Sequence, residues 1–173
     1  MRDFLLRYRW TLRGERRIAS SFMRYFLDTE FNGFGGELIS VALVPEHGDQ
    51  EFYALLPLPE PLHPWVERHV VPYLNSVPPG LSSGPMPRRQ AASEVAAYLA
   101  HDHDPLIVAD WPEDIAHFCS LLVTDAGDMA PVGNLKFEFV SSPGFSTAAV
   151  SRVPHNALHD ARALREFVLR WQG

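Results

Sequence analysis

The chain has 173 residues, 46% of them hydrophobic and 21% charged, which suits one soluble globular domain with a sizeable core. No apolar run approaches the ~20 residues that span a bilayer, and the single cysteine, Cys119, excludes an internal disulfide and fits a reducing, cytoplasmic location. The formal net charge of −6 speaks against a strongly basic protein that grips long nucleic-acid duplexes.

An excess of positive charge lies in residues 1–22, which hold six Arg and two acids. This segment lacks the apolar stretch of a secretory signal. It is interpreted as a flexible extension or the product of an upstream start, with the working domain at residues 23–173. A transit peptide and a nucleic-acid-binding arm are the alternatives. The domain then has a net charge of about −10, so a nucleic-acid role requires a local site, short substrates or bound cations.

The first part of the domain predicts three strands. Residues 23–31 alternate in polarity like a strand, and two further strands are expected at Leu38–Val44 and Glu51–Leu56. The sequence PEHGDQ between these two contains turn-forming residues, so they are expected to form a hairpin.

Helices and strands alternate in the remainder of the chain. Short buried strands are predicted at PLIVAD and KFEFV, and Asp110 is the expected N-cap of the helix that begins in WPEDIAHFCSLLV. Apolar residues at helical spacing mark the other helices: Val66, Val70 and Leu74; Ala92, Val95, Ala96 and Leu99; and Ala157, Ala161, Leu164, Val168 and Trp171 within residues 156–171. This order predicts an α/β fold, with a mixed five-stranded sheet covered by helices on both faces.

Two acids interrupt the first predicted strand, in the sequence YFLDTEF. Asp28 and Glu30 are two residues apart, so their side chains share one face of the strand, roughly 6.5–7 Å apart at their roots. Buried ionised carboxylates repel each other and cost several kcal/mol to desolvate without a partner. Mg²⁺ prefers such oxygen ligands. The pair therefore indicates a metal site or one protonated carboxyl if the strand is buried, and solvated acids if it is an edge strand.

Further acids follow the predicted strand PLIVA. Asp110 ends this strand, and Asp114 lies in the first turns of the next helix, where it can point back towards the sheet. Strand ends that precede helices are where open α/β sheets bind ligands. The alternative for Asp114 is a surface charge stabilised by the helix dipole.

The C-terminal sequence PHNALHDARALREF contributes His155 and Asp160. Five residues of helix leave two side chains roughly 140° apart, so this pair can share a site only if His155 precedes the helix. Pro154 and Asn156 suit such a helix entry. A His there can be neutral near pH 7 and act as a general base, although each residue alone has an ordinary structural explanation.

These motifs together resemble those of the DEDDh 3′–5′ exonucleases, a superfamily that includes ribonuclease T, oligoribonuclease and bacterial proofreading exonucleases. The resemblance is carried by DTEF, by a later Asp on a helix, and by H-x-A-x-x-D-A, which here spans His155 to Ala161. The sequence MRYFLDTEFNGFGGELISVALV is similar to the opening of a small actinobacterial-type group of 3′–5′ exoribonucleases. The resemblance extends from Met23 to about Trp171 and implies a ribonuclease H-like fold.

The resemblance also implies residue roles. Four acids would bind two Mg²⁺ or Mn²⁺ ions and a His would be the general base: Asp28, Glu30, Asp114, Asp160 and His155. Two ions about 3.5–4 Å apart would clamp the attacking and leaving oxygens during phosphodiester hydrolysis, releasing nucleoside 5′-monophosphates from a 3′ end. Family members often have Asn and Phe where this chain has Asp110 and Glu113, so either acid could share the role of Asp114.

Substrate binding is expected next to these acids. Phe31, Phe34, Trp111 and Asp110 are the predicted substrate-binding residues, because aromatic faces stack bases, although core packing is the simpler explanation for each aromatic. The expected substrate is single-stranded or 3′-overhanging RNA. The alternatives are a DNA exonuclease of the proofreading type and a catalytically inactive nucleotide- or RNA-binding module. A homodimer is compatible with the resemblance, but the sequence determines neither the oligomeric state nor the preferred base.

Overall fold

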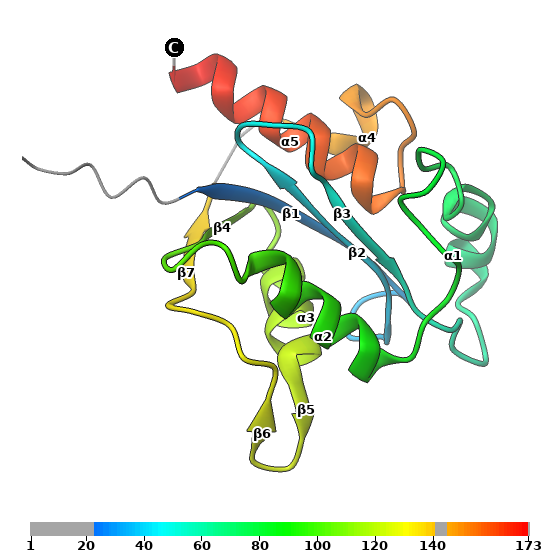
Figure 1. Ribbon diagram of the computed structural model, residues 1–173. Helices are drawn as coiled ribbons and strands as arrows, with labels where there is room; N and C mark the ends of the chain where they lie inside the picture. Colours follow the sequence, from blue (N-terminus) through cyan, green and yellow to red (C-terminus); the bar gives the residue numbers. More distant parts are fainter. Residues whose placement is uncertain (1–22, 141–144, 173) are drawn as a thin grey trace, which may run out of the picture.

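The computed structural model describes residues 23–140 and 145–172, so the interpretation of residues 1–22 lies outside the described range. Five strands form a mixed sheet in the order β3-β2-β1-β4-β7 (Figure 1). Their bounds are β1 Arg24–Phe31, β2 Leu38–Pro45, β3 Phe52–Leu55, β4 Leu106–Ala109 and β7 Lys136–Phe139. β1, β2 and β3 pair antiparallel, whereas β4 and β7 run parallel to β1. The predicted hairpin and the mixed five-stranded sheet are therefore confirmed.

Helices cover both faces of this sheet, as expected (Figure 1). α2 (Arg88–Leu99) and α3 (Pro112–Leu122) pack on one face, and α1 (Pro64–His69) and α5 (Ala157–Gln172) pack on the other. Along β1, Leu27 belongs to the first core and Phe26 to the second, because successive strand residues point to opposite faces. Within the described residues, no helix combines the length and the apolar character that crossing a bilayer requires.

β1 is a central strand, since it lies between β2 and β4. Its side chains are therefore buried from Tyr25 to Glu30. The interpretation of Asp28 and Glu30 as solvated acids on an edge strand is wrong. Both carboxyl groups lie inside the protein, where an ionised group requires compensation.

The segment around Val66 departs from the single helix that its spacing predicts. α1 ends at His69, and a 3₁₀ turn at Val71–Tyr73 follows. Pro72 lacks the amide donor that a continuing α-helix needs at this point. The apolar positions Val66, Val70 and Leu74 are nevertheless buried as predicted.

The last helix also differs in part from its prediction. Ala157, Ala161, Leu164 and Val168 are buried, but Trp171 is 79% exposed, because α5 continues beyond its last buried position. Three elements add to the predicted order. A small hairpin is formed by β5 (Val123–Asp125) and β6 (Asp128–Met129), and the short α4 spans Thr147–Val150.

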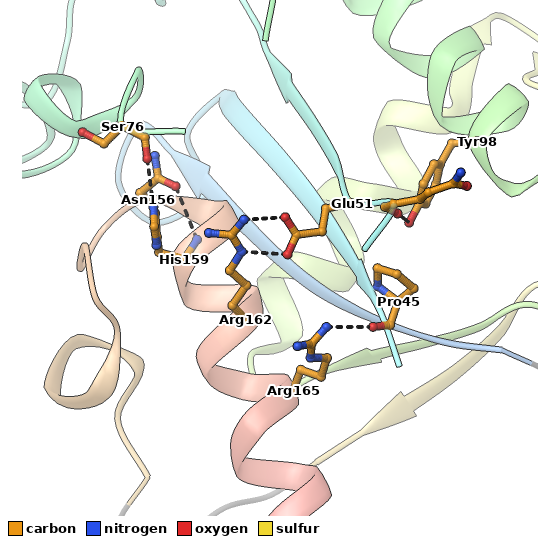
Figure 2. A network of polar contacts seen from close by, with 9 residues as sticks. Pro45, Glu51, Ser76, Tyr98, Asn156, His159, Arg162 and Arg165 are labelled. Carbon is orange, nitrogen blue, oxygen red and sulfur yellow. Dashed lines mark hydrogen bonds and ion pairs between the residues drawn. The ribbon is translucent and has the colours of Figure 1, made fainter. Parts of the chain in front are cut away.

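Polar contacts fix α5 against the sheet (Figure 2). Arg162 binds both carboxylate oxygens of Glu51, which directly precedes β3, and Arg165 donates to the carbonyl of Pro45 at 3.3 Å. Near the start of the helix, a ring nitrogen of His159 lies 2.9 Å from the carbonyl oxygen of Ser76. These contacts hold α5, and with it the turn that precedes the helix, in place beside the sheet.

Candidate metal centre

A cavity of about 900 Å³ lies beside the second half of β1. Its wall includes β1, the segment that enters α3, and the turn that precedes α5. The titratable residues that line it are Asp28, Glu30, His63, Asp110, Asp114, His155 and Asp160. No Lys or Arg occurs among the described residues that line the cavity. The fold thus brings together all five residues to which the resemblance assigns metal binding or proton transfer.

The two acids of β1 lie on the face covered by α1 and α5. In the antiparallel pairing with β2, Asp28 lies opposite Ala42 and Glu30 lies opposite Ser40. Residues opposite one another share a face, and these small partners leave space above the strand. The register shifts between Glu30 and Phe31, so regular pairing ends directly after the second acid.

Asp114, in the first turn of α3, is connected to β1 through the residue between the two acids. One of its oxygens accepts hydrogen bonds from the Thr29 amide at 3.0 Å and the Thr29 hydroxyl at 2.6 Å. The N-cap of α3 is Trp111 without a side-chain cap hydrogen bond, so the predicted capping role of Asp110 is wrong. Asp110 is half-buried and lines the cavity, whereas Glu113 does not line it.

His155 lies on the turn before α5, as predicted, because the helix begins at Ala157. Its backbone φ is +64°, a left-handed conformation that is uncommon for a residue other than glycine. In this conformation its amide donates to Oδ2 of Asp160 at 3.1 Å. The His155 ring contacts Trp65 edge to face, with centroids 4.9 Å apart. Backbone and ring are therefore held by two independent contacts.

The pKa values of the buried acids are raised. Burial raises the pKa of Asp28 and of Glu30 well above their ordinary values, and neighbouring carboxylates raise both further. Burial also raises the pKa of Asp114 to about 7, although the hydrogen bonds from Thr29 act in the opposite direction. The pKa of Asp160 is raised by burial to about 6. Without a cation the site resists full ionisation, and a bound cation would favour the charged forms.

The donor set fits a hard divalent cation. Ligand atoms of Glu30, His155 and Asp160 all lie within 4.8 Å of one another. Oδ1 of Asp160 is buried and has no hydrogen-bond partner among the described residues. Such an unpaired oxygen costs free energy unless an ion or a solvent molecule coordinates it. Carboxylate oxygens are the ligands that suit Mg²⁺ and Mn²⁺.

An aromatic surface borders the acids. Phe31, Phe34 and Trp111 all line the cavity, and the ring centroids of Phe34 and Trp111 are 6.2 Å apart. Phe34 is 83% exposed and Trp111 is 49% exposed, so core packing does not explain either ring. Phe31 is half-buried and stacks on His117, with centroids 4.7 Å apart. Large exposed aromatic rings beside a concave site are typical of ligand contact.

The sequence did not single out Asn32, His63 and Trp65, which also line the cavity. Asn32 joins the end of β1 to the segment before α1, because its side chain accepts from the His63 amide at 2.7 Å and donates to the Pro61 carbonyl at 3.0 Å. In the sequence, Asn32 is marked only by its position directly after a strand, and Trp65 only by its position after a proline and before charged residues. Neither pattern indicates a contact across about thirty residues of chain.

Neither a scan against protein-family models nor a search of curated proteins found a match to this chain.

Proposed function

We propose that the chain is a metal-dependent 3′–5′ exoribonuclease of the DEDDh type that releases nucleoside 5′-monophosphates. The observation that carries this proposal is the convergence of four carboxylates and one His, from three separated segments, on one cavity without a lining Lys or Arg among its described residues. Buried like charges repel, so full ionisation of these acids requires cations from solution. The order of the mixed sheet, with helices on both faces, supports a ribonuclease H-like fold.

The acids have a common expected role, which is to hold two Mg²⁺ or Mn²⁺ ions: Asp28, Glu30, Asp114 and Asp160. Two such ions supply Lewis acidity to the attacking and leaving oxygens of an in-line phosphoryl displacement. Hydrogen bonds from Thr29 orient Asp114, and the amide of His155 orients Asp160. Carboxylates that are already oriented lose little further freedom when they bind a cation.

His155 is expected to accept the proton of the attacking water. Burial, and secondarily the nearby His69, lower the pKa of His155, so the imidazole is neutral near pH 7 and can take a proton. The edge contact with Trp65 restricts the orientation of the ring. As the water oxygen bonds to phosphorus, the P–O3′ bond breaks and the departing 3′-oxygen takes a proton from solvent, to which His155 later releases the proton that it accepted. The products are a nucleoside 5′-monophosphate and a chain shortened by one nucleotide.

RNA is proposed over DNA because the opening of the domain is similar to an exoribonuclease group. The net charge of −6 disfavours long duplexes, for which binding depends on neutralising many phosphates. A single-stranded 3′ end or overhang needs only the cavity and its aromatic rings, since each stacked base contributes about 1–3 kcal/mol.

The test is release of labelled nucleotide from 3′-labelled RNA and DNA of the same sequence, single-stranded and with 3′ overhangs, in Mg²⁺, Mn²⁺ or EDTA. Mononucleotide is expected from RNA in either metal and from neither substrate in EDTA. Faster release from DNA would favour the proofreading alternative. Metal-dependent binding without release would favour an inactive binding module.

Asp28→Ala is the site control for this assay. It is expected to abolish release while the circular dichroism spectrum stays that of a folded protein. Nucleotide release that survives this substitution at the wild-type rate would contradict the assigned site.

A further inference from the structure

The loop that follows β1 carries Phe34 to the mouth of the cavity. It contains three glycines, and two of them, Gly33 and Gly35, have positive φ values of 75° and 70°. Backbone bonds close the loop, with the Asn32 amide donating to Glu37 at 2.9 Å and the Gly36 amide donating to Gly33 at 2.8 Å. Glycines leave a backbone with many accessible conformations, so an exposed ring on this loop needs an anchor to keep one position.

Glu113 supplies a contact to the tip of this loop. Its Oε1 accepts a hydrogen bond from the Gly35 amide, directly after Phe34. The same oxygen lies 3.8 Å from Nε2 of His117, one turn further along α3, and the His117 ring stacks on Phe31. The carboxylate is mostly buried, with 20% of its side chain exposed. Glu113 is therefore fixed between α3 and the loop, and it does not belong to the residues that line the cavity.

This contact determines where Phe34 stands. The centroid of the Phe34 ring lies 6.2 Å from that of Trp111 and 6.5 Å from that of Phe31. Trp111 is the N-cap of α3, two residues before Glu113, so a single helix start positions both the tryptophan and the anchor of the loop. A base that stacks on Phe34 and Trp111 meets a surface whose geometry is set before binding, which lowers the ordering cost of association.

We propose that Glu113 is a positioning residue that holds the Phe34 loop against α3, so that Phe34 and Trp111 form one preorganised surface for the terminal base of the substrate. This inference rests on the proposed function, which places a nucleotide in the same cavity. It also assigns Glu113 a role other than sharing the metal-binding position of Asp114. The surface of Phe34 and Trp111 recognises the base of the nucleotide, whereas the acids and their ions bind its sugar and phosphate.

The experiment compares two ligands that differ only in the base. Calorimetric titration in Mn²⁺ measures the Kd of adenosine 5′-monophosphate and of ribose 5-phosphate for the wild-type protein, Glu113→Ala, Glu113→Gln and the distant control Glu94→Ala on α2. Glu113→Ala is expected to weaken nucleotide binding about fivefold to tenfold and to leave ribose 5-phosphate within twofold. Glu113→Gln keeps an oxygen that accepts from Gly35 and is expected to behave as the wild type, as is Glu94→Ala.

A double-mutant cycle with Phe34→Ala separates positioning from general damage. If Glu113 acts through Phe34, adding Glu113→Ala to Phe34→Ala changes the nucleotide Kd by less than twofold. Equal weakening of both ligands, additive effects in the cycle, or a Gln variant as weak as the Ala variant would each overturn the inference. So would a wild-type protein that binds neither ligand or binds both equally. Base-dependent binding with the expected pattern, but without nucleotide release from RNA, would leave the inference standing and refute the proposed exonuclease.

Discussion

Acidic side chains have opposite electrostatic environments in two regions of this molecule. Arg162 on α5 binds both carboxylate oxygens of Glu51 (Figure 2). Arg24, the first residue of β1, binds Glu46 through two nitrogens, each 2.7 Å from a carboxylate oxygen. These hydrogen bonds to Arg24 lower the pKa of Glu46. In the cavity, the pKa of Asp28 is raised well above its usual value by burial, with the neighbouring acids adding to the shift.

In these two pairs outside the cavity, the chain supplies an Arg as the cationic partner of the acid. It does not do so in the cavity, where the described lining residues include five carboxylates and neither Lys nor Arg. An acid cluster that is left without protein cations must be compensated by protons or by ions from outside. The same substitution, Glu to Gln, should therefore have opposite consequences in the two regions.

The largest difference is expected in activity. Glu30→Gln keeps the shape of the side chain but removes a charged metal ligand, so nucleotide release from RNA should fall about 10³-fold or more, on the scale of several kcal/mol that bound metals contribute. Glu51→Gln, the matched control outside the cavity, should keep release within about twofold. The measurement is the initial rate in saturating Mg²⁺. Comparable rates for Glu30→Gln and Glu51→Gln would contradict the claim that only the acids of the cavity take part in the reaction.

Substitution of His155, the proposed proton acceptor, is expected to have the next largest effect on activity. His155→Asn leaves the acids in place but removes the imidazole, so kcat should fall about 10²-fold or more. Mn²⁺ binding by calorimetry should be retained, because the carboxylates supply the ligands. If Mn²⁺ binding is lost together with activity, His155 is a ligand of the metal and the general-base role is wrong.

Stability should depend on pH in the direction set by the raised pKa values. Asp114, with a pKa of about 7, binds a proton in the folded state at pH values where the unfolded chain, with a pKa near 4, does not. Its stabilising contribution is fully present below the unfolded pKa and is lost as pH rises through about 7. In EDTA, the midpoint of thermal unfolding should therefore fall as the pH rises from about 7 to about 8, where unfolded His, with a pKa of about 6.5, has lost most of its bound protons.

Two comparisons make this pH measurement specific to the cavity. Saturating Mn²⁺ should remove the fall, because cations stabilise the ionised acids. Glu30→Gln should raise the midpoint in EDTA at about pH 8, since it removes one buried charge from the cluster. A midpoint that increases over this range in EDTA would contradict the raised pKa values of these acids.

The smallest effect is expected on stability when Glu51, the acid paired with Arg162, is substituted. Glu51→Gln weakens a half-buried, bidentate ion pair with Arg162, so the free energy of unfolding should decrease by about 1 kcal/mol. A double-mutant cycle with Arg162→Met isolates this pair in urea unfolding. Stabilisation by Glu51→Gln in EDTA would show that the two regions do not differ in the way proposed.

Much of the site was predictable because its residues lie in local patterns. The spacing of Asp28 and Glu30 placed them on one face of a strand, and helix-entry residues placed His155 before α5. The prediction for Asp110 failed, because the helix start shifted by one residue to Trp111 and freed the carboxylate to line the cavity. Capping rules identify a neighbourhood, but packing of the helix decides which residue occupies the cap.

By itself the sequence determined the five strands of the main sheet, the main helices and the chemical types gathered in the cavity, because periodicity and residue chemistry are local properties. Only the tertiary structure decided that β1 is central and its acids buried, and that Asp114 contacts Thr29, 85 residues away. It also decided that Glu113 accepts a hydrogen bond from the Gly35 amide and that Phe34 is exposed at the mouth of the cavity. These outcomes depend on which distant segments pack together, and no local pattern in the chain encodes that choice.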